Sequence, residues 1–287
     1  MAPGAEIRTP DGGTVLLFAP RVINEGRIDT SNGQAILAAG AKVYLAPSSD
    51  LRLRGLLVEV DPFDPTGTPL GGTVQNRKAG AAEIAAERQE MVGRLRDNAV
   101  LSAGATAAQA DALIAQRVGE IVARTGNATL IGHAVNQEGR ISATTSVTSN
   151  GSIYLLARDT TKAVDNASAG TIDRFATRTG NLLLGTGSVT EVQPDTAATT
   201  TSIDAQDFNP SEVALMGHKI DLQGTAAIVA PAGKVTLEAV LDPSNKRHSG
   251  STSLALIATT AVSCSTAAAA STLPACAMSL STCRAIR

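Results

Sequence analysis

A short phrase recurs along the chain: a glycine followed by apolar residues, ending in alanine or another small residue. It occupies residues 13–19, 33–39, 151–157, 180–186 and 233–239. Each copy has the length of one short β-strand that begins at a turn, and such a strand cannot bury its apolar side chains alone. The first two copies are about 20 residues apart, a period typical of repeats that stack into a solenoid.

A second phrase, Glu-Gly-Arg-Ile followed by Asp or Ser, occupies residues 25–29 and 138–142, with a looser echo at 170–173. Within the phrases apolar residues alternate, as at Val15, Leu17 and Ala19, so one face of each strand is expected to point inward. We therefore predict a mainly β chain in which residues 1–78 and 119–242 form a parallel β-helix. At roughly 20 residues per coil this gives about ten coils, each rising about 4.8 Å.

The composition agrees with stacked coils. Apolar residues make up 43% of the chain, but aromatic residues make up only 2%. A core built almost wholly from Ala, Val, Ile and Leu suits narrow interior slots in which the same aliphatic residue repeats. The formal net charge of -2 disfavours nucleic-acid binding, which needs clustered Lys and Arg. No run of about 18 apolar residues occurs, so no transmembrane helix is predicted.

Residues 79–118 have a different character, being rich in Ala, Glu and Arg. Glu90 precedes Arg94 by four residues, and Thr106 with Gln109 forms a capping-box pattern. Gly119 can end the second helix in a left-handed conformation. We predict an antiparallel α-helical hairpin, turning at residues 102–105, inserted between the two parts of the β-helix.

Residues 243–287 are dominated by Ala, Ser and Thr and show no sustained period. Too few large apolar residues are present to offset an ordering entropy of roughly 1–2 kcal/mol per residue. We predict a disordered C-terminal tail that cannot extend the strand ladders. All three cysteines, Cys264, Cys276 and Cys283, lie in this tail without a Cys-x-x-Cys spacing.

Taken in order, the phrases resemble the filamentous haemagglutinin family of two-partner-secreted exoproteins and adhesins. The matching text is residues 24–29 with 33–40, residues 136–142 with 151–159, and residues 208–213 with 224–237. The resemblance covers about residues 11–78 and 119–241. It implies a right-handed parallel β-helix and export through an outer-membrane β-barrel transporter. It also implies a secreted or cell-surface location. The chain shows neither a signal peptide nor an Asn-Pro-Asn-Leu-like secretion motif, so we expect an internal fragment of such an exoprotein or a degenerate reading frame whose tail no longer matches.

Function is then expected on the outer faces, as a non-enzymatic adhesin segment that binds a host or cell-surface ligand. The alternative is a β-helix carbohydrate-active enzyme, a polysaccharide lyase or hydrolase. Asp29, Asp173 and Asp221 each follow an isoleucine, and an acidic row on one face would supply the paired carboxylates of such an enzyme. Outward polar positions at strand ends explain the same residues more simply, and the chain has few rings for a sugar platform.

The three histidines, His133, His218 and His248, stand far apart and in no metal-ligand spacing. We expect them to be exposed turn residues. No dinucleotide or phosphate-binding glycine motif and no Gly-x-Ser-x-Gly nucleophile elbow occurs. The sequence therefore predicts no catalytic residue, no metal site and no cofactor.

Overall fold

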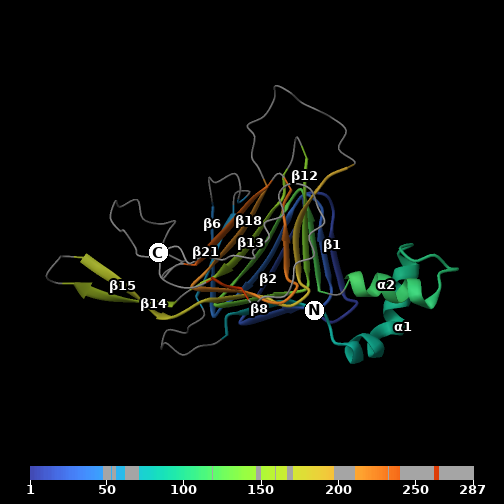
Figure 1. The fold of residues 1–287 in the computed structure, drawn as a ribbon, viewed down its shortest axis with the longest axis horizontal. Helices are drawn as coiled ribbons and strands as arrows, with labels where there is room; N and C mark the ends of the chain where they lie inside the picture. The colour runs from blue at the N-terminus through green and yellow to red at the C-terminus, as the bar shows by residue number, and fades with distance from the viewer. Residues whose placement is uncertain are drawn as a thin grey trace, which may run out of the picture.

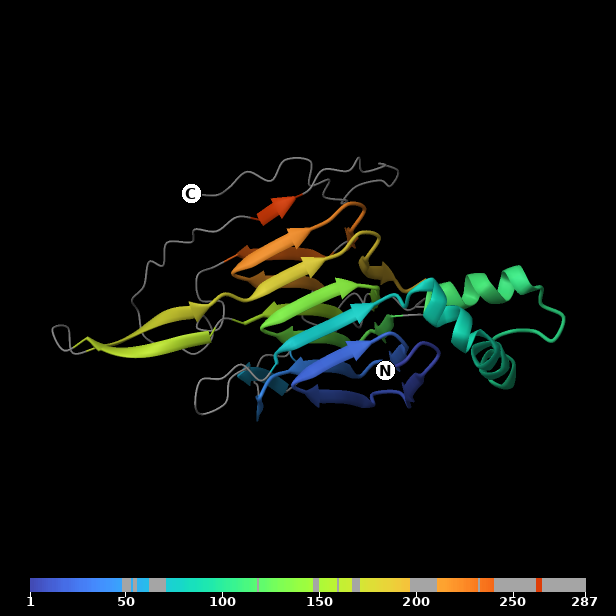
Figure 2. The same cartoon turned by 90° about the horizontal axis from the view of Figure 1, so that it is seen from below.

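Three long parallel sheets make up the body of the computed structural model (Figures 1 and 2). The structure describes residues 1–47, 53, 56–61, 71–117, 119–146, 150–158, 160–166, 171–196, 211–231, 233–239 and 262–264. Sheet A contains β1 (Glu6–Thr9), β4 (Arg27–Thr30), β9 (Glu120–Arg124), β12 (Arg140–Thr145), β17 (Val189–Pro194) and β20 (Ala227–Val229). Sheet B contains β2 (Thr14–Ala19), β5 (Gln34–Ala39), β10 (Asn127–Gly132), β13 (Ser152–Ala157), β18 (Glu212–Gly217) and β21 (Lys234–Ala239). Sheet C contains β3 (Arg21–Asn24), β8 (Thr73–Arg77), β11 (Ala134–Glu138), β16 (Asn181–Leu184), β19 (Lys219–Leu222) and β22 (Val262–Cys264).

The chain visits sheets A, B and C in turn and then returns to sheet A beside its previous strand. This order is compatible with a parallel β-helix, and the mainly β prediction is confirmed. Each sheet has six described strands, so the expected ten coils are too many. The estimate fails because it divided the β segments by a constant period, whereas long insertions take up much of that length.

Two antiparallel hairpins leave the body after strands of sheet B and return to strands of sheet C. The first pairs β6 (Lys42–Pro47) with β7 (Leu56–Asp61), and the second pairs β14 (Thr160–Asn166) with β15 (Thr171–Arg178). The second hairpin projects far from the sheets in Figures 1 and 2. Residues 42–61, which the sequence analysis counted in the first part of the β-helix, therefore include a hairpin that lies outside the three stacked sheets.

Two helices connect sheet C to sheet A: α1 (Ala81–Asp97) and α2 (Ala107–Arg117). At the start of α2 the backbone N–H of Gln109 donates to Thr106 Oγ1 at 3.3 Å, and the N–H of Thr106 donates to Gln109 Oε1 at 2.9 Å. This is the reciprocal pattern of a capping box. After α2, Gly119 has a φ of 63°, which favours glycine. The helices share a buried cluster of Ala79, Met91, Leu95, Leu101, Ala110 and Ile114.

The space between the sheets is filled by aliphatic ladders in register. In sheet B one position is leucine in all six strands: Leu17, Leu37, Leu130, Leu155, Leu215 and Leu237. The four central leucines have no exposed surface. Repetition of one side chain lets identical shapes stack at the strand spacing of about 4.8 Å. The alternation read from the sequence phrases therefore points these residues inward as expected.

Backbone crowding explains the glycine before two of the sheet B strands, β5 and β10. A Cβ at Gly33 would lie 1.8 Å from the carbonyl oxygen of Gly13, and one at Gly126 would lie 1.9 Å from that of Gly33. Because backbone atoms cannot move aside like a flexible side chain, any larger residue would force the turns apart. At these two turns glycine is therefore a packing requirement.

A buried amide ladder runs along the inner face of sheet C. Asn24 Nδ2 donates to Asn76 Oδ1 at 2.8 Å, and Asn76 Nδ2 donates to Gln137 Oε1 at 2.8 Å. Gln137 Nε2 in turn donates to the carbonyl oxygens of Gly139 and Val189. All three amides are fully buried. In the next two strands leucine replaces the amide at Leu184 and Leu222, so the polar ladder gives way to an apolar one.

The predicted disordered tail falls almost wholly outside the described residues. Within it, β22 pairs in parallel with β19, placing Cys264 opposite Leu222. The expectation that the tail cannot extend a ladder is therefore wrong for residues 262–264. This strand, Val-Ser-Cys, is short even for a β-strand and does not stand out from the Ala-, Ser- and Thr-rich residues around it.

Candidate functional site

The densest group of charges lies on the outer face of sheet A, beside the helices. Glu6, Arg27, Glu120 and Arg140 occupy one register row of β1, β4, β9 and β12, with alternating sign. Opposite charges on directly opposed positions stabilise neighbouring strands. The arginines of both Glu-Gly-Arg-Ile phrases fall in this row, which gives the second sequence phrase a structural role.

Arg27 is the centre of the group, and its side chain is only 14% exposed. Its Nη2 lies 2.9 Å from Asp29 Oδ2 and its Nε lies 3.5 Å from Glu6 Oε1, while Nη1 pairs with Glu120. Glu6 also binds Arg8 at 2.9 Å and Arg117, from the end of α2, at 3.1 Å. Three carboxylates thus meet three guanidinium groups. We call Glu6, Arg8, Arg27, Asp29, Arg117 and Glu120 the charge clasp.

Burial and neighbouring charge act on Arg117 in the clasp. Removal from water lowers the pKa of its guanidinium below the usual value, and Arg27 lowers that pKa further. Glu6 and Glu120 act in the opposite direction. The ion pair of Arg117 with Glu6 fastens the end of α2 to sheet A.

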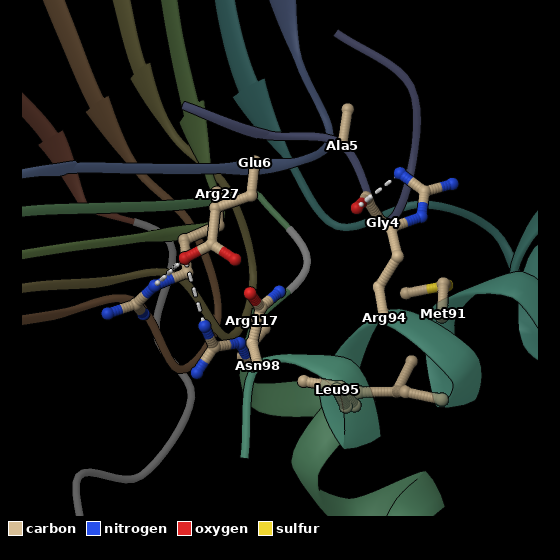
Figure 3. A pocket seen from close by; sticks show the side chains of 10 residues that line it. Gly4, Ala5, Glu6, Arg27, Met91, Arg94, Leu95, Asn98 and Arg117 are labelled. Carbon is tan, nitrogen blue, oxygen red and sulfur yellow. Dashed lines mark hydrogen bonds and ion pairs between the residues drawn. The ribbon is translucent and has the colours of Figure 1, made fainter. Parts of the chain in front are cut away.

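A small hollow lies between the clasp and α1 (Figure 3). Met91 and Leu95 line its apolar side, and Arg94 crosses it to donate from Nη1 to the carbonyl oxygen of Gly4 at 2.9 Å. Its volume is about 30 Å³. A water molecule needs roughly 10–15 Å³ measured in this way, so the hollow has room for a water or two but not for a sugar ring.

The clasp is poorly suited to acid–base chemistry. A retaining or inverting glycosidase needs one protonated and one ionised carboxyl group facing a bound sugar. Here each carboxylate is already paired with a guanidinium group of the protein, so none of the three stands free to face a substrate. The arrangement serves packing of the helices against the sheet.

The acidic residues singled out in the sequence are not brought together. Asp29 lies in β4 of sheet A, Asp173 in β15 of the second hairpin, and Asp221 in β19 of sheet C. They form no row on one face. Asp29 is only 4% exposed and belongs to the clasp, while Asp221 accepts a hydrogen bond from Gln223 Nε2 at 3.1 Å.

The histidines differ in part from the prediction. His133 and His218 both stand at the turn from sheet B to sheet C, and both are half-buried rather than exposed. His133 Nδ1 lies 3.0 Å from the carbonyl oxygen of Arg158. His248, Cys276 and Cys283 lie outside the described residues.

A second apolar cluster covers the outer face of sheet B, and nothing in the sequence analysis anticipated it. Its buried members are Ile36, Ala38, Val58, Ile131, Tyr154, Leu156, Ala214 and Met216. The first hairpin contributes Val58 from β7, and Glu59 of the same strand binds the buried Arg158 at 2.8 Å. Sheet B is thus apolar on both faces. An apolar outer face is unusual, and here the first hairpin packs against part of it through Val58.

Among the described residues, no three His, Cys, Asp or Glu side chains converge in a way that could hold a metal ion. Neither α1 nor α2 has the length and apolar character needed to cross a bilayer. No protein-family model, curated protein or solved structure matches the chain.

Proposed function

We propose that the chain is a right-handed parallel β-helix, with an inserted helical hairpin, that acts as a non-enzymatic adhesin segment of the filamentous haemagglutinin kind. In this proposal the stacked sheets are a rigid support, and the insertions at their corners carry the binding surface. Such a segment is secreted or displayed at the cell surface after passage through an outer-membrane β-barrel transporter, and it binds a host or cell-surface ligand.

The observation that carries the proposal is where the insertions leave the body. Both β-hairpins depart after a strand of sheet B, and the helices depart after a strand of sheet C, while the strands between them remain in register. Loops that project from a rigid scaffold are the usual place for recognition residues. In Figure 2 the second hairpin, β14 and β15, projects from one side of the sheets and the helices project from the other.

The enzyme alternative receives less support. A β-helix lyase or hydrolase needs acidic side chains that converge on a groove, whereas Asp29, Asp173 and Asp221 lie on separate sheets. The densest charge cluster is internally paired, and its hollow is too small for a sugar. The structural features therefore favour surface recognition.

Binding to cells tests the proposal. Residues 1–287, labelled with a fluorophore, are titrated onto epithelial monolayers and onto a glycan array. We expect saturable binding that competes with unlabelled chain. In one variant residues 159–178 are replaced by a Gly-Ser turn, which removes the second hairpin. Binding should fall at least tenfold in this variant, while the far-ultraviolet circular dichroism of the sheets persists.

A second deletion provides the matched control. Replacing residues 79–117 by a Gly-Ser turn removes the helices but leaves both β-hairpins. Loss of binding only in this variant would show that the helices, and not the second hairpin, carry the binding surface. The adhesin proposal would be refuted if neither residues 1–287 nor the deletion variants bound saturably and the full chain released reducing ends from a panel of polysaccharides. That result would favour the enzyme.

A further inference from the structure

The two β-hairpins leave the body at the same corner, where the chain passes from sheet B to sheet C. The first hairpin follows β5 and the second follows β13, two passes of the chain later. In the pass between them, β10 continues directly to β11 through a tight turn at His133. β7 of the first hairpin contacts both β5 and β10. The first hairpin therefore lies over sheet B on the side from which the second hairpin departs.

Arg158 is the residue at which the second hairpin leaves sheet B, between β13 and β14. Its backbone N–H donates to the carbonyl oxygen of Gly132 at 2.7 Å, and its own carbonyl oxygen lies 3.0 Å from His133 Nδ1. Gly180 follows the return strand β15, and a Cβ at Gly180 would lie 2.7 Å from the carbonyl oxygen of Arg158. The two ends of the second hairpin thus meet at the backbone of Arg158.

The side chain of Arg158 reaches the first hairpin. Its Nη2 lies 2.8 Å from Glu59 Oε1 in β7, and the two side chains are only 4% and 21% exposed. Val58 and Tyr154 line, together with Arg158, a hollow of about 20 Å³, which has room for about one water molecule. An ion pair removed from water in this way is screened little by salt, and loss of one partner costs far more than at the surface.

We propose that the Arg158–Glu59 ion pair couples the two hairpins, with Arg158 acting as a positioning residue for the second hairpin. While the first hairpin is docked on sheet B, Glu59 fixes the guanidinium group and so restrains the backbone from which β14 departs. When the first hairpin lifts, this restraint is lost and the base of the second hairpin becomes more mobile. Coupling free energies are reciprocal, so a ligand that immobilises the second hairpin also holds the first hairpin against sheet B.

This inference rests on the proposed function only where it treats the second hairpin as a binding element. It gives the first hairpin a regulatory role, because its docking sets how rigidly the binding element is held. The coupling itself belongs to the protein without ligand. Absence of coupling would therefore leave the adhesin proposal standing, and absence of cell binding would leave the coupling standing.

Hydrogen exchange of residues 1–287 without ligand, followed by mass spectrometry of peptides, tests the coupling. In Glu59→Ala the amides of β6 and β7 should exchange at least about tenfold faster, and those of β14 and β15 several-fold faster. Asp61→Ala is the matched control, since Asp61 lies in the same strand but pairs with Lys42 of its own hairpin, at 3.7 Å, and is 36% exposed. It should leave exchange of β14 and β15 unchanged.

Circular dichroism establishes that both variants keep the stacked sheets. Two results would overturn the proposal. One is unchanged exchange of β14 and β15 in Glu59→Ala, which would show that the ion pair holds the first hairpin alone. The other is an equal effect of the two substitutions on β14 and β15, which would show that the contact with Arg158 has no special part.

A second pair of variants shows whether Glu59 acts through Arg158. Arg158→Met keeps an unbranched side chain in the apolar surroundings but cannot bind a carboxylate. Because the partner of Glu59 is then missing, adding Glu59→Ala to Arg158→Met should leave the exchange of β14 and β15 as it is in Arg158→Met alone. The same several-fold acceleration with and without Arg158 would overturn the proposal, since the first hairpin would then act on the second by another route.

Discussion

The leucine ladder of sheet B predicts a gradient of stability along the stack. Leu155 is fully buried and lies between Leu130 and Leu215 in register. Leu→Ala in a core costs about 2–5 kcal/mol, and the cost is largest where the surroundings cannot collapse into the cavity. Hydrogen-bonded strands on both sides hold the backbone around Leu155, so we expect its replacement by alanine to lower the free energy of unfolding by about 4 kcal/mol.

Leu237 is the matched control, since it occupies the same ladder in β21, is partly exposed, and has one described ladder neighbour, Leu215. Its replacement by alanine should cost about 1–2 kcal/mol, because less apolar surface leaves the core. Equilibrium unfolding in urea, followed by far-ultraviolet circular dichroism, measures both values. Equal costs at the two positions would refute the reasoning, because they would mean that Leu155 is no better packed than the end of the ladder.

Three further outcomes are expected. Asn76→Ala breaks the buried amide ladder and should cost about 2–5 kcal/mol in the same unfolding assay, since it leaves the amide groups of Asn24 and Gln137 without one partner each. Glu6→Gln weakens the clasp, so hydrogen exchange of α2 amides should accelerate at least several-fold while sheet B amides stay unchanged. Truncation after Asp242 removes β22 and should lower the unfolding midpoint, with unchanged secondary structure elsewhere by circular dichroism; an unaltered midpoint would show that β22 adds nothing to sheet C.

The sequence phrases located much of sheet B correctly for a physical reason. A stack of strands needs glycine where turns crowd together and the same aliphatic residue at each inward position. Both requirements produce repeats in the amino-acid sequence. Four of the five glycine phrases become strands of sheet B, and the fifth becomes β16 of sheet C. The two Glu-Gly-Arg-Ile phrases become β4 and β12 of sheet A.

Two features left no such trace. Alternation with a period of two is the same in a stacked strand and in a hairpin strand, so β6 and β7 could not be told from coils. The charge clasp could not be predicted from the sequence either, because Arg27 and Glu120 are 93 positions apart and no local pattern links them. Only the return of the chain to sheet A after the helices brings them together, which places Asp29 in a charge cluster that no local pattern could indicate.

The helices between β8 and β9 also bear on how fast the molecule can assemble. β4 and β9 are direct neighbours in sheet A, yet the chain between Asp29 and Glu120 must close a very long loop before they pair. Helix formation takes about a microsecond or less, far faster than the closure of non-local sheets. Helices that fold first shorten the remaining flexible chain, and the cost of closure falls with the logarithm of its length. The insertion that interrupts the stack in sequence would then speed the step that joins the first two passes of the chain to the third.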